Sequence, residues 1–351
     1  SGLASGEPVF LCGPPGTAKT AMVEEMARCL SVKYFYYLLT RFTEPDELLG
    51  PLDVSALRAG EYKRIMANRL PDSDIVFLDE IFKAGSAVLN VLLDVILNRR
   101  ILNGTEYIPL PTLAIYTASN EVTSDADLSA FYDRLLIRSF IQYVSDDLID
   151  TLLSYGVLID TKAPRERPSL SRDYVIQLQN FTALRARTIA ADQTLREKIV
   201  KAIIALKGRG IILSDRRKVK LVKVVAAVST VLGEKEVTPG AVGTALLLVA
   251  PHDEEELKKV HEVVAEEKLS PFDFTAYHTL IEEGLAIAEK VRERLRNDTI
   301  SRQELMELRG VREELAKLYE KIPRNLLTIT ALRRIYAAIS EIDTVLRSIS
   351  G

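Results

Sequence analysis

Residues 13–20 read Gly-Pro-Pro-Gly-Thr-Ala-Lys-Thr and directly follow an apolar run at residues 9–11. Small residues turn the chain tightly after a strand, and a helix then begins at Lys19, so that free backbone N–H groups and the positive end of the helix dipole face an anion. The Lys19 ammonium would contact the β- and γ-phosphates of a nucleotide, and the Thr20 hydroxyl could ligate Mg²⁺. A plain strand-to-helix turn is the alternative, but this pattern is uncommon by chance.

The position before the lysine departs from the usual form of this motif, because it is Ala18 where glycine is usual. Alanine adopts helical dihedral angles easily at the start of a helix, so we expect the loop to keep its conformation. The residues that we expect to contact the nucleotide are Gly13, Pro15, Gly16, Thr17, Ala18, Lys19, Thr20 and Ala21.

A second group of candidate residues follows the apolar run at residues 75–78. Such a run is typical of a parallel strand that is buried on both faces, and it ends in Asp79 and Glu80. A carboxylate at the end of this strand, next to a phosphate loop, is placed where Mg²⁺ needs an acidic partner. We therefore expect Asp79 to hold the metal and Glu80 to polarise the attacking water. An acidic pair after a strand is often only a solvated strand end, but here the upstream phosphate loop favours catalysis.

The composition argues against several classes of protein. The 351 residues include 46 Lys and Arg and 49 Asp and Glu, so the net charge is −3, which disfavours a general binder of nucleic acid or anionic membranes. Apolar runs stay below the ~18 residues that span a bilayer, and residues 1–4 do not resemble a signal peptide. Cys12 and Cys29 lack metal-binding spacing and are expected to be reduced. We therefore expect a cytoplasmic protein.

The first part of the chain alternates strand and helix signals, which predicts a parallel sheet between helical layers. We expect this αβα domain to cover residues 1–163. The expected elements are strands at 9–11, 34–39, 75–78 and 113–117, helices at 21–30 and 84–98, and a helix capped by Thr43. Two hairpins are expected at residues 53–65 and 101–110, the second with a turn at Asn103-Gly104.

The rest of the chain is predicted to be helical. The composition breaks at residues 163–168, which indicates a linker, and residues 164–252 are expected to form one compact helical domain. Apolar residues continue at helical spacing through residues 253–351. This pattern predicts a C-terminal extension that is a helical hairpin or a small bundle. An arm that docks a partner protein is the alternative interpretation of the extension.

The chain, with both hairpins placed, resembles the MoxR family of AAA+ ATPases, and most closely its RavA-like subgroup, over residues 3–250. The motifs that carry the resemblance are residues 13–20, 39–45 running to 50–52, 75–82, 119–121 with 132–138, and Ser214-Asp215-Arg216-Arg217. The resemblance implies an α/β fold with a P-loop αβα core, an all-α lid at residues 164–252 and, in this chain, a C-terminal helical extension. Such domains normally carry an N-terminal segment that flanks the adenine, so we expect the natural chain to start earlier.

The resemblance also implies roles for three further residues. Asn120 would be the first sensor, which aligns a water molecule with Glu80. Arg134 would be the arginine finger, which completes the site of a neighbouring subunit. Arg216 would be the second sensor, which reaches from the lid to the γ-phosphate.

Both arginines also have ordinary interpretations, because exposed arginines are common and add little to stability. Arg134 could form a local ion pair with Asp133, and Arg216 could lie on a solvated helix end. Arg138 and Arg217 are the alternatives for the two roles. The family pattern further implies a ring, usually a hexamer, with ATP and Mg²⁺ at each subunit boundary.

Three functions follow from these observations. The resemblance favours a Mg-dependent ATP hydrolase that acts in a chaperone-like way on a protein client, together with a partner that carries a von Willebrand A domain. A nucleic-acid motor would need Lys or Arg on its hairpins to follow phosphates, whereas residues 103–106 are polar or acidic and residues 53–65 mix both charges. A weakly hydrolysing, nucleotide-controlled scaffold would have a degraded site, but Lys19, Asp79, Glu80 and Asn120 are all present.

Overall fold

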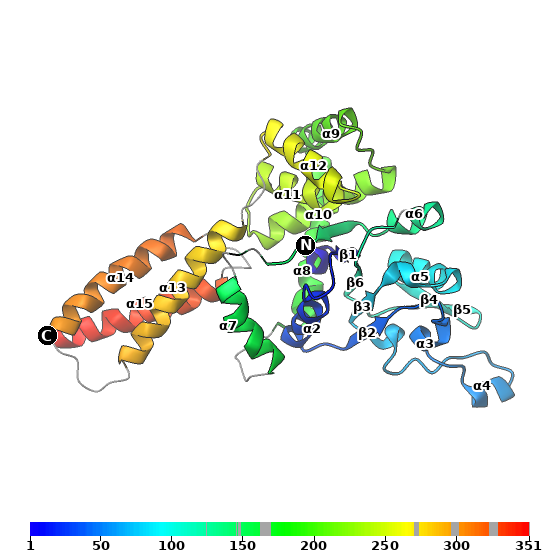
Figure 1. Cartoon of the computed structure of the whole chain (residues 1–351), viewed down its shortest axis with the longest axis horizontal. Helices are drawn as coiled ribbons and strands as arrows, with labels where there is room; N and C mark the ends of the chain where they lie inside the picture. The colour runs from blue at the N-terminus through cyan, green and yellow to red at the C-terminus, as the bar shows by residue number, and fades with distance from the viewer. Residues whose placement is uncertain are drawn as a thin grey trace.

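The computed structural model describes residues 1–123, 125–144, 146, 149–161, 170–269, 274–295, 302–322 and 329–350. Within these residues the chain forms a parallel sheet flanked by helices, a group of shorter packed helices, and three long helices that extend to one side (Figure 1). The α/β core with added helices confirms the expected fold class. The linker expected at residues 163–168 lies outside the described residues.

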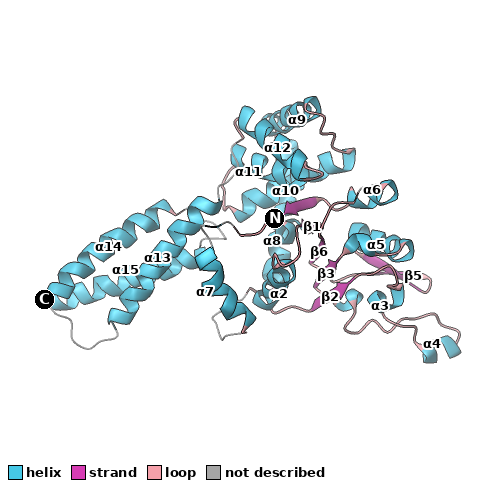
Figure 2. Ribbon diagram, in the orientation of Figure 1, coloured by secondary structure: helices cyan, strands magenta, loops and turns pink. Residues whose placement is uncertain are grey.

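A five-stranded sheet forms the centre of the first part (Figure 2). The strand order is β2-β3-β6-β1-β7, and every neighbouring pair is parallel. The strands are β1 (Val9–Cys12), β2 (Tyr34–Leu38), β3 (Ile75–Asp79), β6 (Ala114–Ser119) and β7 (Ile137–Phe140). Four of them agree with the expected positions to within two residues, because short apolar runs are what a sheet covered on both faces requires. The fifth strand, β7, begins within the last two residues of the motif at 132–138 that carried the family resemblance.

Successive side chains of each strand enter two different cores, because they point to opposite faces of the sheet. In β1, Val9 and Leu11 join one apolar cluster while Phe10 and Cys12 join the other. Helix α2 (Lys19–Leu30) covers the first face, and helices α3 (Pro45–Leu49), α5 (Ser86–Asn98) and α6 (Ala126–Tyr132) contribute to the second. The sheet therefore lies between two helical layers, with its strand ends free for polar residues.

One of the two expected hairpins is confirmed, and the other is wrong. Strands β4 (Arg100–Asn103) and β5 (Glu106–Pro109) pair in antiparallel register, with the turn at Gly104 and Thr105, one residue later than the expected Asn103-Gly104. Residues 53–65 instead contain the helix α4 (Val54–Arg58), and one isolated bridge joins Leu52 to Arg64. The Asp53 carboxylate accepts hydrogen bonds from two backbone N–H groups of the first turn of α4, which is an N-cap that favours a helix over a strand.

The cap of α3 also differs from the expectation, which gave Thr43 this role. Glu44 is the N-cap, and it forms a capping box with Glu47. The Thr43 hydroxyl instead accepts a hydrogen bond from the backbone N–H of Thr40, at 2.9 Å. Thr43 therefore stabilises the turn before the helix rather than the helix itself.

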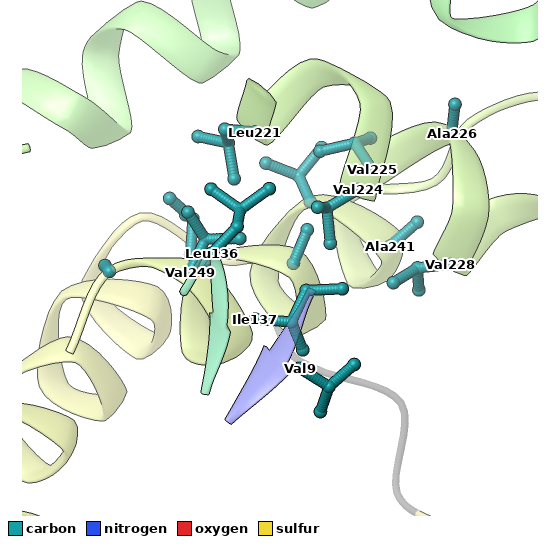
Figure 3. Packing of buried hydrophobic residues seen from close by; sticks show 14 of the residues in the cluster. Val9, Leu136, Ile137, Leu221, Val224, Val225, Ala226, Val228, Ala241 and Val249 are labelled. Carbon is teal, nitrogen blue, oxygen red and sulfur yellow. The ribbon is translucent and has the colours of Figure 1, made fainter. Parts of the chain in front are cut away.

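Five helices form the part that we call the lid: α8 (Arg172–Ala191), α9 (Gln193–Gly208), α10 (Asp215–Val231), α11 (Pro239–Val249) and α12 (Glu254–Glu266). Their apolar residues and one face of the sheet belong to a single cluster, and Figure 3 shows side chains of β1, β7, α10 and α11 gathered in it. Buried Glu7, just before β1, also pairs with Lys220 and Lys223 of α10 at 2.7 and 2.8 Å. Because α12 packs against α9 and α11, we propose that the lid extends to residue 269 instead of ending at 252.

The C-terminal part consists of α13 (Phe274–Leu295), α14 (Arg302–Lys321) and α15 (Ile329–Ser350). Each of these helices packs against the other two around its own apolar cluster. The expected small bundle is therefore a three-helix bundle, which Figure 1 shows extending away from the sheet. Among the described helices, none is both long and apolar enough to cross a membrane.

Gly243 on α11 provides a test of how closely α12 is bound into the lid. A methyl group at this position would lie 1.8 Å from the backbone carbonyl oxygen of Leu269, just after α12. We expect Gly243→Ala to lower the free energy of unfolding by about 3 kcal/mol, because backbone cannot retreat easily from a new atom in a packed core. Urea denaturation followed by circular dichroism measures this change.

Gly208→Ala is the matched control, because a methyl group at the end of α9 would meet no atom within 4 Å. It should leave stability unchanged or raise it by up to about 1 kcal/mol through helix propensity. Equal effects of the two substitutions would contradict the packing of residue 269 against α11.

Candidate nucleotide-binding site

The phosphate loop, residues 13–18, joins β1 to α2 and depends on unusual backbone angles. Gly16 has φ of 82°, and Ala18, the N-cap of α2, has φ of 57° and ψ of 23°. The expectation that Ala18 adopts helical dihedral angles is therefore wrong, since the residue lies in the left-handed region, which costs an alanine roughly 1–2 kcal/mol. Gly13 is needed for space, because a Cβ there would lie 2.2 Å from the carbonyl oxygen of Ile141.

Lys19 turns back into the phosphate loop. Its ammonium group donates hydrogen bonds to the carbonyl oxygens of Gly13 and Pro14 at 2.7 and 2.9 Å, and Thr17 Oγ1 lies 3.4 Å away. The residue is 8% exposed. Thr17 also donates to the carbonyl of Pro14, at 2.9 Å. These bonds hold the loop in a closed curve around a positive charge.

The N-terminus of α2 fits a phosphate group. No side chain caps this helix, and its first turn contains no acidic residue. The backbone N–H groups of the first turn have no partner within a helix, and the helix dipole favours an anion there. With Lys19 beside them, these groups match the donor set that a nucleoside triphosphate requires. Thr20 lies in the same turn, and its hydroxyl could ligate Mg²⁺.

The parallel register brings the ends of three strands together at one edge of the sheet. Cys12 of β1 pairs with Ser119 of β6, and β6 also pairs with β3, which ends at Asp79. The backbone N–H of Gly13 donates to the carbonyl of Ser119 at 3.2 Å. Consequently the phosphate loop, Asp79 and Asn120, which follows Ser119, are neighbours on this edge.

Glu80 is held by three contacts. Its carboxylate accepts a hydrogen bond from Asn120 Nδ2 at 2.8 Å, and Lys83 Nζ lies 3.3 Å from the same oxygen. Its backbone N–H donates to Asp79 Oδ1 at 2.9 Å. Its φ of 54° and ψ of 47° place it in the left-handed region, where a non-glycine residue persists only if its surroundings enforce it.

Arg134 lies in the turn that connects α6 to β7. Its guanidinium donates to the carbonyl of Ala130 within α6, and its Nε is buried without a hydrogen-bond partner. The local ion pair with Asp133, which was the alternative interpretation of Arg134, is not among the interactions that the structure gives these two residues. The Asp133 carboxylate instead accepts from the hydroxyl of Ser214, at 3.0 and 3.1 Å to its two oxygens.

The alternative arginines differ sharply in their surroundings. Arg138 is 4% exposed, donates to the carbonyls of Tyr132, Leu135 and Pro251, and stacks on the Tyr132 ring at 3.7 Å. All of its contacts are internal, so it serves the fold. Arg216, by contrast, is exposed at the start of α10.

Arg217 is 3% exposed, and neither of its terminal nitrogens has a hydrogen-bond partner. Burial, and then the neighbouring positive charge of Arg138, lower the pKa of Arg217 to about 9. A buried and unpartnered guanidinium is costly, and it is the kind of group that gains most from an anion. The sequence alone did not distinguish Arg217 from Arg216, because the two are adjacent and only the helix orientation separates them.

Two further residues of the site carried no signal in the sequence that we used. Lys83 follows Glu80 by three residues, a spacing that could have indicated the ion pair. The hydroxyl of Tyr143, beyond β7, donates to the carbonyl of Pro15 at 3.2 Å, and only the tertiary structure brings it to the phosphate loop. Neither Cys12 nor Cys29 forms a disulfide, and burial raises the pKa of Cys12 to about 11.

Comparison with known proteins gives a consistent result. Residues 2–180 match the family described as the MoxR domain in MoxR–vWA–beta-propeller ternary systems. Two uncharacterised proteins from Methanocaldococcus jannaschii are 32% identical over 236 residues and 33% identical over 239 residues, in each case over 67% of this chain. The chain spans about three fifths of the length of these curated relatives, 60% and 59%.

A crystal structure of a candidate ATPase from Cytophaga hutchinsonii has a TM-score of 0.58 and 16% identity, over 77% of this chain and 87% of that one. At this identity the likeness shows the fold alone. The expected RavA-like subgroup is not confirmed by these matches. The family match covers the phosphate loop, Asp79, Glu80 and Asn120, which the structure holds at one edge of the sheet. The chain therefore belongs to the MoxR family of AAA+ ATPases.

Proposed function

We propose that this chain is a Mg-dependent ATP hydrolase that acts as a ring on a protein client. The observation that carries the proposal is the hydrogen bond of 2.8 Å between Asn120 and Glu80, beside a phosphate loop whose lysine is in place. A carboxylate fixed in this way by an amide can orient a water molecule for attack on the γ-phosphate. Nothing in a purely structural strand end would require it.

The residues of this chain divide the chemistry among them. Lys19 and the first turn of α2 would bind the phosphates and balance their charge. Asn120 and Lys83 occupy one oxygen of Glu80, which leaves its second oxygen to accept a hydrogen bond from water. Thr20 and Asp79 would hold Mg²⁺, and this metal supplies charge neutralisation between the phosphates when it is bound.

Arg217, rather than Arg216, is our choice for the lid residue that contacts the γ-phosphate. It is the buried arginine of the pair, and its terminal nitrogens have free donor capacity. An anion bound there would offset the cost of burying this charge. The assignment of this role to Arg216 rests on the family resemblance alone.

Arg134 is proposed to act on a neighbouring subunit in a ring, which the family pattern makes hexameric. Its guanidinium donates to a carbonyl of the preceding helix α6, and no hydrogen bond among the described residues directs it to the phosphate loop of its own chain. An arginine inserted from a neighbour adds positive charge where the transition state spreads negative charge, which accelerates hydrolysis by ~10³ or more.

A protein client is supported over nucleic acid by the charges of the inserted segments. Lys63 pairs with Glu61 at 2.6 Å, and Arg64 pairs with Asp46. The tip of the β4–β5 hairpin, residues 103–106, carries Glu106 and no basic residue. Basic side chains that are already neutralised are poorly suited to follow a phosphate backbone.

A partner with a von Willebrand A domain is supported by the description of the matching family, which names such systems. We place this assembly in the cytoplasm, where cysteines stay reduced, since Cys12 and Cys29 form no disulfide. A scaffold that hydrolyses weakly is disfavoured because Lys19, Asp79, Glu80 and Asn120 are all present and Glu80 is hydrogen-bonded to Asn120.

Lys19→Ala and Glu80→Gln separate binding from turnover. Lys19→Ala should abolish ATP binding, because it removes the charge and opens the loop. Glu80→Gln should keep ATP affinity but reduce turnover by at least ~100-fold, since the amide is a poor acceptor for a water proton. Fluorescent-nucleotide binding and phosphate release measure the two effects. Unchanged binding by Lys19→Ala would show that the loop is not the site.

The choice between the lid arginines is tested with Arg217→Met and Arg216→Met. Arg217→Met should raise the free energy of unfolding without nucleotide by about 1–3 kcal/mol, because it removes a buried unpaired charge. It should also reduce ATP turnover by roughly 100-fold. Arg216→Met should change stability by less than about 0.5 kcal/mol.

Arg138→Met is the control for burial, and it should destabilise by about 3 kcal/mol, because three buried carbonyls lose their donor. Thermal and urea unfolding, with steady-state ATPase assays, give all of these values. Loss of turnover in Arg216→Met but not in Arg217→Met would return the role to Arg216.

Action between subunits is tested by mixing Arg134→Ala with Glu80→Gln. Each variant alone should bind ATP and hydrolyse it at a rate reduced by ~100-fold or more. In co-assembled mixtures, an Arg134→Ala subunit retains Glu80 in its own site, and a Glu80→Gln neighbour can provide the missing Arg134. Random assembly should restore roughly a quarter of the wild-type rate. Phosphate release by the mixture, with no recovery above the separate variants, would argue against the proposed ring.

A further inference from the structure

We propose that the hydrogen bond between Asp133 and Ser214 positions the arginine finger Arg134, so that the lid of one subunit controls hydrolysis in its neighbour. This inference rests on the proposed function, because it requires Arg134 to act between subunits. It adds two positioning residues, one next to the finger and one at the start of lid helix α10. Neither residue touches the chemistry itself.

The contact joins two segments that are far apart in the sequence. Ser214 Oγ lies 3.1 and 3.0 Å from the two carboxylate oxygens of Asp133, 81 residues away. A serine hydroxyl has one proton, so the two oxygens share it. A hydrogen bond to a charged acceptor is stronger than one between neutral groups, which makes this contact suited to fix the turn that carries Arg134.

Ser214 is fixed on the lid side. It is the N-cap of α10, and its oxygen accepts the backbone N–H of Arg217. Further along the same helix, Lys220 and Lys223 pair with buried Glu7. The position of Ser214 therefore follows the position of α10, and the residues expected to sense the γ-phosphate are its close neighbours on that helix.

The turn on the other side is also bound to the lid. The Tyr132 hydroxyl donates to the carbonyl of His252, and the two rings lie edge to face at 4.7 Å. Arg138 donates hydrogen bonds to the carbonyls of both Tyr132 and Pro251. Residues 251–252 connect α11 to α12, so the lid contacts the turn on two sides.

Arg134 itself has little that would hold it. Its guanidinium donates to the carbonyl of Ala130, and its Nε is buried without a partner. The backbone of the turn is thus the main determinant of where this side chain points. Because Asp133 precedes Arg134 directly, a shift of α10 is transmitted to the finger through one side chain and one peptide unit.

The experiment uses the co-assembled mixture of full-length Arg134→Ala and Glu80→Gln chains. In this mixture the finger comes only from the Glu80→Gln chain. Adding Asp133→Ala to that chain should reduce the restored rate by roughly tenfold, with the KM for ATP unchanged, because misplacement of a catalytic group lowers the rate of the chemical step. Adding Asp133→Ala to the Arg134→Ala chain should change the restored rate by less than twofold, since that chain supplies no finger.

Two variants keep the test independent of folding. Ser214→Ala on the Glu80→Gln chain removes the other partner, and the loss from both substitutions together should not exceed the loss from either one. Asp133→Asn retains an acceptor oxygen and should recover most of the rate. Melting temperatures of all chains, measured without nucleotide, identify any general destabilisation.

The outcomes are distinct. A loss confined to the finger-donating chain supports the proposal. An equal loss on either chain, or no loss on the donor, overturns the positioning role while the ring proposal stands. An absence of restored activity in the parent mixture overturns action between subunits, and the positioning role with it.

Discussion

The parallel register of β3, β6 and β1 is the constraint on which the whole site depends. Because neighbouring strands run in the same direction, their carboxyl ends meet at one edge, and the residues that follow them must be adjacent. At this edge the backbone N–H of Gly13 donates a hydrogen bond to the carbonyl of Ser119, and the Asn120 side chain donates one to the Glu80 carboxylate. The apolar side chains of the strands, buried on both faces, fix this register. The chemistry at the edge is thus a consequence of packing below it.

The site contains strained and unpaired groups that destabilise the fold locally, and packing elsewhere in the fold offsets this cost. Ala18 and Glu80 both have left-handed backbone angles, and Arg217 buries a guanidinium whose terminal nitrogens have no partner. Strain and unpaired charge of this kind persist where the surrounding structure enforces them, and they are frequent at functional sites. Here the shared core of sheet and lid provides that enforcement. The same continuity means that the lid and the sheet are packed together as one unit.

The sequence was informative where the signal is local, and uninformative where it is tertiary. The loop with Lys19 and the strand before Asp79 are contiguous patterns whose chemistry follows from residue type, and the structure places them as expected. The hairpin at residues 53–65 was wrong because a single cap, Asp53, favours a helix, and the dihedral angles of Ala18 were wrong because the loop overrides alanine's preference. The difference between Arg216 and Arg217 depends on how α10 is rotated against the sheet, which adjacent residues cannot reveal.

The most direct measurement is a cryo-EM structure of the Glu80→Gln chain with ATP and Mg²⁺. The account predicts a ring in which the triphosphate lies between Lys19 and Asp79, with Arg217 of the same chain and Arg134 of the neighbouring chain directed at the γ-phosphate. It would be contradicted by a triphosphate bound elsewhere, or by an assembly in which Arg134 stays on the carbonyl of Ala130, away from every nucleotide.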